Sequence, residues 1–329
     1  MGTSVVRYTK STSDTPSWGV LRDTTIHPLN VASDHHRDVM KLYFHKRLEF
    51  DAAIGADGID ESSIEYLSPV SQQIQLIVQG MNYASHRAEG GIFNDDDTAE
   101  DEDENLIFSK ASSSISKPNE TILRPKGVKL LDYEIELGLI MKADISEAVT
   151  VTDDNLGDYI GGVILANDVS ARDAMFGAPA MQWYKGKSQR TFCPLGPVLY
   201  LLDEGDIQQI YSFELKLHRN GELKQHSTTD QLIHKPPKTL TELSVFTNLQ
   251  IGDCILTGTP GGVLMNLNLK TAMAILLNLK NDFKRRKKLT EAQMARESFL
   301  KPGDILELEI RSVDGTINLG KQRNAIAEA

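Results

Sequence analysis

The sequence predicts a β-rich α+β fold with helical insertions, and three observations support that prediction. Short apolar runs separated by turn residues recur from residue 74 to the C-terminus, and closely spaced short strands are typical of β-rich domains. Asn220-Gly221 lies between two strand-like runs, as in a type I′ hairpin turn, whose two central residues need positive φ. Few segments have the length and the apolar periodicity of a long helix.

The N-terminal part, residues 1–73, is predicted to form a small α/β domain. Residues 4–8 and 18–21 have the composition of short strands. Residues 34–46 are compatible with a helix. We expect the boundary just before a new strand-like run, so that the second domain spans residues 74–329.

The second domain is predicted to alternate strands with turns. Each of its apolar runs is four to nine residues long, and such a length suits strands better than helices. The predicted strands are residues 74–78, 133–141, 162–167, 197–202, 213–218, 222–228, 253–256 and 304–310.

The composition is that of a globular enzyme and argues against two other classes of protein. The 329 residues are 40% hydrophobic and 25% charged, with a net charge of −11. An acidic chain lacks the basic surface that non-specific nucleic-acid binding needs. No run approaches the roughly 18 apolar residues of a membrane span. Residues 1–10 show no apolar signal segment, so we expect a cytoplasmic location.

Three carboxylates form a candidate metal site. Glu134 and Glu136 are two residues apart in the strand-like run 131–137, so alternation along a strand would point both to one face. There they repel each other unless a cation or a proton lies between them. Asp168 follows a second apolar run. Three such oxygen donors suit Mg²⁺ or Mn²⁺ better than zinc, although most E-x-E pairs simply lie on the solvent face of a strand.

Two strongly charged segments each have two interpretations. Residues 95–104 hold eight acidic residues, which predicts a solvated loop, with a Ca²⁺-binding loop as the alternative. Residues 284–288 are all basic. They predict a solvated helix face, with a localisation signal or polyanion-binding patch as the alternative.

Three further clusters have residue types that suit catalysis. His86 and Glu89 are three residues apart, so on a helix the carboxylate can touch and orient the imidazole, as a general base requires. Lys187 precedes an apolar turn and could neutralise a substrate carboxylate or a developing enolate. Residues 257–262 follow a strand and could form an anion-binding turn. Taken one at a time, such features are more often surface residues or structural turns.

Seven segments, in this order along the chain, resemble the fumarylacetoacetate hydrolase family. They are spread over about residues 74–329. The segments are residues 80–86, 132–137, 167–173, 191–197, 220–222, 257–260 and 299–304.

The resemblance implies the architecture and the metal. The fold would be a mixed β-roll catalytic domain with a smaller N-terminal domain, and the assembly a homodimer. A Mg²⁺ or Mn²⁺ ion, with Ca²⁺ as a third candidate, would be held by Glu134, Glu136 and Asp168.

The resemblance also implies roles for residues around the metal. His86 and Glu89 would lie on a lid that orders over the substrate, and Lys187 would face the substrate. These three are the predicted catalytic residues. Substrate contacts are predicted for Tyr83, Lys110, Arg172, Thr191 and Thr259.

Some positions depart from the family pattern. Gln189 and Arg190 follow the lysine-serine pair, where an aromatic residue or glycine and then aspartate are common. Ala174 and Met175 stand where many members have Trp-Gln. Residues 264–298 form a long insertion. Because the substrate-facing positions differ, the family's substrates do not transfer directly to this chain.

The leading functional prediction is metal-dependent cleavage of a C–C bond in a small anionic 2,4-dioxo acid, such as an acylpyruvate, through a metal-stabilised enolate. His86, oriented by Glu89, would deprotonate the attacking water. One alternative is decarboxylation, isomerisation or hydration of a 2-oxo acid with the same enolate chemistry. The other is a non-catalytic, metal-stabilised dimer, which the departures from the pattern favour and the presence of His86, Glu89 and Lys187 opposes.

Overall fold

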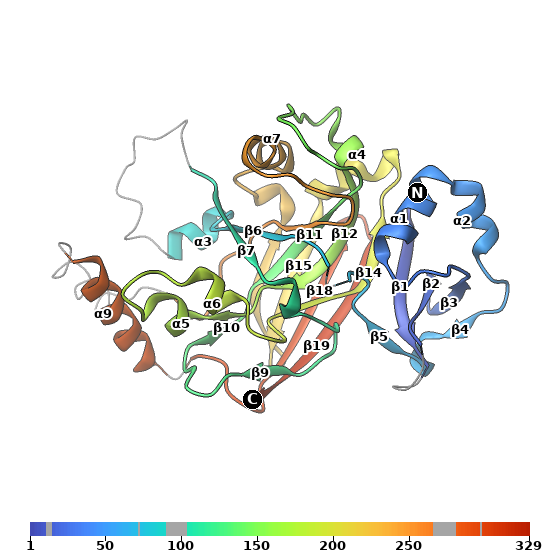
Figure 1. Cartoon of the computed structure of the whole chain (residues 1–329). Coiled ribbons are helices and arrows are strands. Elements are labelled where there is room, and N and C mark those ends of the chain that lie inside the picture. Colours follow the sequence, from blue (N-terminus) through green and yellow to red (C-terminus); the bar gives the residue numbers. More distant parts are fainter. Residues whose placement is uncertain (11–14, 72, 90–103, 266–280, 297) are drawn as a thin grey trace.

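Two large β-sheets dominate the structure, a computed structural model that describes all residues except 11–14, 72, 90–103, 266–280 and 297. The sheets lie across the middle of the molecule, and helices gather at its two ends and along one edge (Figure 1). This arrangement confirms the predicted β-rich α+β fold.

The larger sheet contains strands from both predicted domains. Among the described residues its strands are β1 (Thr3–Thr9), β2 (Ser17–Arg22), β3 (Thr25–Leu29), β4 (Ile59–Asp60), β5 (Glu65–Leu67), β6 (Leu76–Gly80), β7 (Leu106–Lys110), β8 (Ile115–Ser116), β11 (Ile135–Met141), β12 (Ile160–Asn167), β14 (Cys193–Leu201) and β17 (Cys254–Leu256). Their order is β4-β3-β2-β1-β14-β12-β11-β17-β6-β7, with β5 beside β1 and β8 beside β14. The antiparallel pairing of β1 with β14 joins the two predicted domains.

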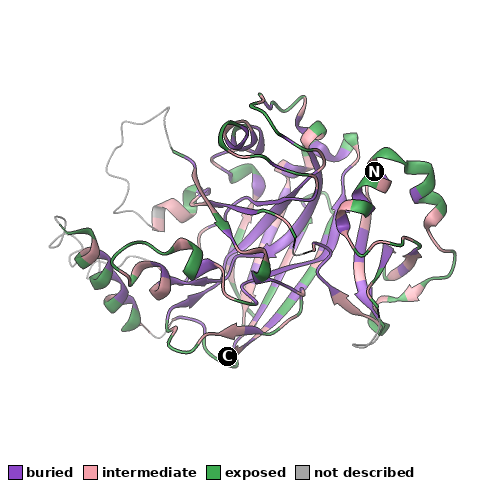
Figure 2. Ribbon diagram, viewed as in Figure 1, coloured by how far each residue is buried: buried purple, intermediate pink, exposed green. Residues whose placement is uncertain are grey.

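The second sheet packs against the first through one apolar face. Its order is β16 (Glu222–Thr228), β15 (Phe213–Arg219), β18 (Ile305–Ser312), β19 (Asn318–Glu328) and β9 (Ile122–Arg124). Alternate residues of β15 and β18 are buried, as expected for a sheet with one face on the core. Leu215 and Leu308 share a core cluster with Leu137 and Leu139 of β11. Figure 2 shows this buried layer in the middle of the molecule.

The helices among the described residues are short and lie outside the sheets. They are α1 (His36–His45), α2 (Arg47–Ala53), α3 (Ala84–Glu89), α4 (Leu156–Tyr159), α5 (Arg172–Phe176), α6 (Trp183–Lys187), α7 (Pro236–Phe246) and α9 (Asp282–Met294), with 3₁₀ turns η1 (Glu61–Ser63), η2 (Ser112–Ser114), η3 (Glu204–Tyr211) and η4 (Thr229–Gln231). In the part of the chain that the structure describes, no helix is long and apolar enough to cross a membrane.

Several local predictions are confirmed and some elements were missed. Asn220 and Gly221 have φ of 53° and 81° and connect β15 to β16, as the hairpin prediction requires. The basic run 284–288 lies within α9, but Arg286 is buried there, so the prediction of a fully solvated helix face is wrong at that residue. Helix α7 and strand β19 were not predicted from the sequence. Residues 95–103 lie outside the described residues, so the prediction of a solvated loop there stays a prediction.

The predicted strand 133–141 is wrong at its first two residues, because the strand is interrupted at Tyr133 and Glu134 and only Glu136 of the E-x-E pair lies in β11. A separate strand, β10 (Leu131–Asp132), pairs with β13 (Ser170–Ala171) in a small sheet, and β11 begins only at Ile135. At the break, Asp132 Oδ1 accepts from the Tyr133 amide at 2.9 Å, and the Glu134 amide donates to Asn167 Oδ1 at 3.1 Å. Side chains thus replace the strand's backbone partners at this point.

The core near the N-terminus contains residues from both predicted domains. Val5 and Val20 belong to the same apolar cluster as Ile140 and Leu199. Because the two predicted domains share this core, the domain boundary at residue 73 stays a prediction.

Candidate metal centre and active site

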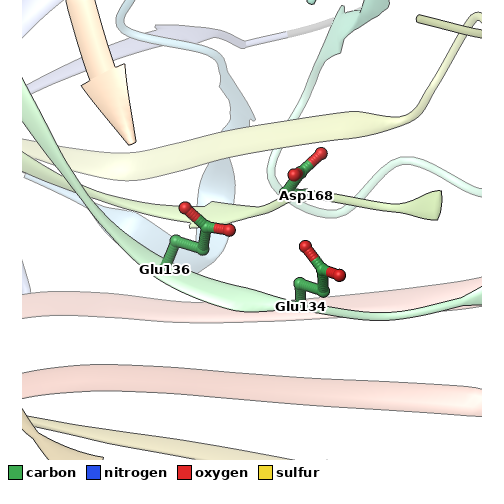
Figure 3. A group of neighbouring side chains, drawn as sticks. All are labelled: Glu134, Glu136 and Asp168. Carbon is green, nitrogen blue, oxygen red and sulfur yellow. The ribbon is translucent and has the colours of Figure 1, made fainter. Parts of the chain in front are cut away.

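Glu134, Glu136 and Asp168 converge on one point (Figure 3). Each offers a carboxylate oxygen, and the three oxygens lie within 4.8 Å of one another. The pairing of β11 with β12 brings them together, because it sets Glu136 opposite Ala166 and lets the Asp168 amide donate to the Glu134 carbonyl at 2.8 Å. All three carboxylates are buried, so their charges require nearby compensation.

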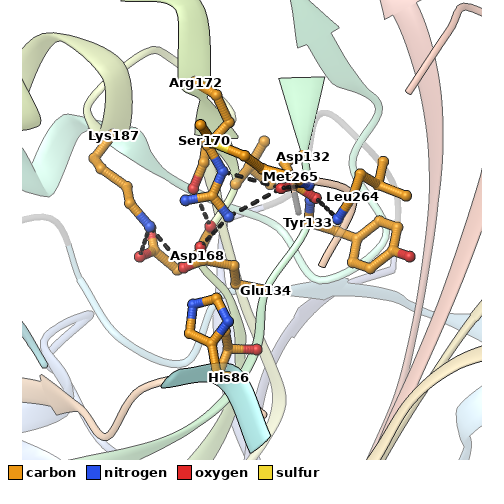
Figure 4. A network of polar contacts seen from close by, with 12 residues as sticks. His86, Asp132, Tyr133, Glu134, Asp168, Ser170, Arg172, Lys187, Leu264 and Met265 are labelled. Atoms are coloured by element: carbon orange, nitrogen blue, oxygen red, sulfur yellow. Dashed lines mark hydrogen bonds and ion pairs between the residues drawn. The ribbon is translucent and has the colours of Figure 1, made fainter. Parts of the chain in front are cut away.

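Buried cations compensate two of the three carboxylates (Figure 4). Lys187 Nζ lies 2.6 Å from Glu134 Oε2 and 2.5 Å from Asp168 Oδ2. Lys110 Nζ donates to Asp168 Oδ1 at 2.5 Å. Arg172 donates to Glu134 Oε1 at 2.5 Å. Burial by itself would raise the pKa of Glu134, but the Lys187 and Arg172 charges outweigh it and hold that pKa well below its usual range.

Glu136 differs from the other two carboxylates in its partners. Its Oε2 accepts from the Gly258 amide at 2.7 Å, whereas its Oε1 is buried and has no hydrogen-bond partner among the described residues. Burial, together with the charges of Asp168 and Glu134, raises the pKa of Glu136 well above its usual value. An unsatisfied buried oxygen beside two further carboxylates fits a hard divalent cation, which takes such oxygens as ligands.

Asp132, which the sequence did not single out, connects the metal centre to the insertion after residue 263. Its Oδ2 accepts from Arg172 Nε at 3.0 Å, and its Oδ1 accepts from the Leu264 amide at 2.9 Å. Arg172 therefore bridges Asp132 and Glu134. The sequence does contain a signal for this role of Asp132. An aspartate within an apolar, strand-like run is expected to be buried, and a buried carboxylate must be paired.

His86 and Glu89 lie on α3, which contacts the turn after β17. His86 Nδ1 is 3.4 Å from Glu89 Oε2. Glu89 Oε1 accepts from the Gly262 amide at 2.7 Å, and Ser85 Oγ accepts from the Gly261 amide at 3.0 Å. Gly262 has a φ of +104°, and a Cβ there would lie 2.0 Å from a carbonyl oxygen of β16. This turn, from the T-G-T-P segment, thus requires glycine in order to hold Glu89 beside the histidine.

One cavity is lined by Glu134, Glu136 and the histidine, whereas Asp168 is not among its lining residues. Its volume is about 270 Å³, just below the roughly 300–1,000 Å³ of pockets that hold drug-sized ligands. The predicted catalytic residues His86, Glu89 and Lys187 line it together with Glu134 and Glu136. Residues from α3, β11 and α6 thus meet at one site.

The predicted substrate contacts divide into two groups. Arg172 and Thr259 line the cavity, whereas Tyr83, Lys110 and Thr191 are not among its lining residues. Lys110 reaches Asp168 instead, Thr191 Oγ1 accepts from the Leu123 amide at 2.9 Å, and the Tyr83 side chain is buried. Substrate contact by these residues stays a prediction.

Aromatic residues of the cavity were not indicated by the sequence. Phe108 of β7, Phe176 of α5 and Trp183 of α6 line it. No local pattern connects residues that are so far apart in the chain, although Trp183 lies one helical turn before Lys187.

Known proteins are similar to this chain over most of its length. Residues 75–327 match the family model described as fumarylacetoacetate (FAA) hydrolase, C-terminal. A mitochondrial oxaloacetate tautomerase of Bos taurus is 35% identical over 205 residues, 62% of this chain and 62% of that protein, so the match spans less than two thirds of this relative. A 2,4-didehydro-3-deoxy-L-rhamnonate hydrolase of Sphingomonas sp. (strain SKA58) is 30% identical over 290 residues, 85% of each chain.

A solved structure has a similar fold. The fumarylacetoacetate hydrolase of psychrophilic Exiguobacterium antarcticum superposes with a TM-score of 0.72 at 25% identity, covering 99% of this chain and 100% of that chain. The similarity therefore extends beyond residues 75–327 to the N-terminal strands.

Proposed function

This chain belongs to the fumarylacetoacetate hydrolase family, and from that premise we propose that it cleaves a C–C bond in a small 2,4-dioxo acid with the help of Mg²⁺ or Mn²⁺. Members of the family act as hydrolases, isomerases and tautomerases on small keto acids. The observation that carries the proposal is the convergence of Glu134, Glu136 and Asp168 within 4.8 Å, because the two glutamates line a cavity that His86 also lines. A divalent ion held by these carboxylates would polarise the substrate carbonyl as a Lewis acid.

The residues of the chain supply the proton transfer and the charge balance. Glu89 lies beside His86 Nδ1, and a carboxylate that holds this nitrogen leaves Nε2 to accept a proton from water. The Gly262 amide holds Glu89 in turn. Lys187 Nζ adds a positive charge at the same cavity, and this charge stabilises the negative charge of a bound 2-oxo acid.

A second candidate reaction is the tautomerisation of a 2-oxo acid such as oxaloacetate, or its decarboxylation, isomerisation or hydration. The relative from Bos taurus, named as an oxaloacetate tautomerase, favours it. Tautomerisation and decarboxylation need the metal and a proton carrier but no attacking water, so the same residues support both candidates.

Product analysis on two substrates separates the candidates. Acetylpyruvate and oxaloacetate are each incubated with the protein and Mg²⁺, and again with excess chelator. The proposal expects acetate and pyruvate from acetylpyruvate, and only with metal. Enol–keto interconversion or CO₂ release from oxaloacetate, without cleavage of acetylpyruvate, would contradict the proposed hydrolysis and support the second candidate reaction.

The base assignment has its own test. His86→Ala should lower kcat for acetylpyruvate cleavage on the order of 10²-fold to 10³-fold, because no other group is proposed to take the proton from water. A change in KM alone would contradict the assignment.

The assembly and the location belong to the proposal as well. A homodimer would give twice the mass of the 36.5 kDa chain in light scattering. The cytoplasmic location stays a prediction, and the relative from Bos taurus is named as mitochondrial.

A further inference from the structure

The outer end of the cavity carries three aromatic side chains that the proposed chemistry does not use. The charged residues at the inner end, among them Glu136 and Lys187, are buried. Phe108, Phe176 and Trp183 line the same cavity and are only partly buried. The cavity therefore runs from a charged, buried end to an aromatic end that is nearer to solvent.

The three rings form a continuous surface. The ring centroids of Phe108 and Trp183 are 5.1 Å apart. Those of Phe176 and Trp183 are 6.2 Å apart, with an interplanar angle of 72°, which is an edge-to-face arrangement. Lys187 Nζ lies 5.3 Å from the Phe108 ring centroid, so this aromatic surface begins beside the charged end. A ligand that covers the rings would remove apolar area from water and gain binding free energy.

The charged residues at the outer end are occupied with one another. Arg286 of α9 donates to Asp282 Oδ2 at 2.8 Å and to the carbonyls of Ala178 and Pro179 at 3.1 and 2.7 Å. Arg285 donates to Asp282 Oδ1 at 2.7 Å. These two arginines and one aspartate leave one net positive charge, so a second carboxylate is the rival to an aromatic group at this end, and the test below includes a dicarboxylate.

We propose that the substrate carries an aromatic or similarly large apolar group at the end distal to its 2-oxo acid. The substrate class would then be an aroylpyruvate, such as 2,4-dioxo-4-phenylbutanoate. Its 2-oxo acid end would lie by Glu136 and Lys187, and its ring would pack against Trp183. This inference rests on the proposed function, because it uses the metal centre to orient the substrate.

The test compares three substrates on the full chain with Mg²⁺. For wild-type protein, kcat/KM for 2,4-dioxo-4-phenylbutanoate should exceed that for acetylpyruvate by on the order of 10-fold to 100-fold. It should also exceed the value for fumarylpyruvate, a 2,4-dioxo acid with a distal carboxylate. A value for acetylpyruvate or fumarylpyruvate equal to or above that for the phenyl substrate would overturn the inference.

Variants test whether the aromatic rings cause the preference for the phenyl substrate. Trp183→Ala should lower the phenyl-to-acetyl ratio of kcat/KM by about 10-fold. Tyr184→Ala is the matched control, because Tyr184 is the next residue of α6, is 61% exposed and is not among the cavity's lining residues. If Trp183→Ala fails to fold, Phe176→Ala carries the same comparison. An unchanged ratio in a folded variant would contradict the role of the rings.

A binding measurement distinguishes failure of the inference from failure of the proposed function. Calorimetry compares phenylpyruvate with pyruvate, neither of which has the 2,4-dioxo group that is cleaved. Tighter binding of phenylpyruvate that is lost in Trp183→Ala supports the aromatic site even if no dioxo acid is cleaved, in which case the proposed function fails alone. Equal binding, together with cleavage of acetylpyruvate, would overturn the inference and leave the proposed function intact.

Discussion

At its inner end the cavity is lined by buried carboxylates held by lysine and arginine, whereas at its outer end it is lined by half-buried rings. Glu134 there accepts from Lys187 and Arg172 at 2.6 and 2.5 Å, so the loss of either cation leaves a buried carboxylate with less compensation of its charge. Phe176 and Trp183 make ring contacts and are partly exposed. The difference indicates that the inner end supports both the fold and the chemistry, while the outer end can change with the substrate at little cost in stability.

The largest effect should come from the inner end. Glu136→Gln should lower the metal-dependent kcat by at least about 10³-fold, because a ligand that supplies charge to the ion is lost. The thermal unfolding midpoint should fall little, since the carboxylate oxygen that lacks a partner is replaced by a neutral group. Steady-state kinetics checks this, with the exposed Glu147→Gln as the control. Full metal-dependent turnover by Glu136→Gln would contradict the catalytic role of the inner end of the cavity.

Removal of the arginine at the inner end should destabilise the protein. Arg172→Met leaves Asp132 and Glu134 buried without their shared partner, and we expect a loss of about 3–5 kcal/mol in the free energy of unfolding. Denaturant titration measures it. Arg323→Met is the control, because that side chain is 64% exposed and lies 3.8 Å from Glu307, so its loss should cost less than about 0.5 kcal/mol. Equal losses in the two variants would contradict the account.

Acid should lower the stability of the protein through His36, which lies away from the cavity. His36 is buried, and desolvation lowers its pKa to about 4, against about 6.5 in an unfolded chain. Between these values the unfolded chain binds a proton that the folded chain does not. The free energy of unfolding should therefore fall by about 3 kcal/mol as the pH drops from about 6.5 to about 4, and this contribution is constant above that window.

Denaturant titrations at several pH values check this expectation. The His36→Gln variant should show a flatter pH dependence in that window, whereas the exposed Arg323→Met should keep the wild-type slope. A variant slope as steep as that of wild type would show that His36 is not the group that titrates.

The smallest effect should come from the outer end. Phe176→Ala removes a ring that is already partly exposed, so the free energy of unfolding should fall by no more than about 1–2 kcal/mol. Denaturant titration beside Arg172→Met makes the comparison direct. A loss as large as that of Arg172→Met would mean that the rings hold the fold together.

The inner end could be predicted from the sequence because its chemistry lies in short local patterns. Glu134 and Glu136 are two residues apart, and Asp168 directly follows the strand that pairs with that of Glu136. The hairpin at Asn220 was predictable for the same reason, since the turn residues themselves adopt the positive φ.

The outer end could not be predicted because it depends on tertiary packing. Phe108 and Trp183 come from β7 and α6, and only the fold brings their rings to 5.1 Å. The break before Ile135 was also hidden, because it depends on Asn167 accepting the Glu134 amide, a contact between separate segments. A pattern within one segment carries no information about such partners.

If Glu134, Glu136 and Asp168 hold the catalytic ion, bound Mn²⁺ must lie among them. Crystals of the protein grown with Mn²⁺ would be measured at a wavelength where manganese scatters anomalously. We expect one strong anomalous peak per chain at bonding distance from the three carboxylates, and its loss in Glu136→Gln. A peak elsewhere, or none at the carboxylates while the enzyme still requires Mn²⁺, would contradict this role of the carboxylates.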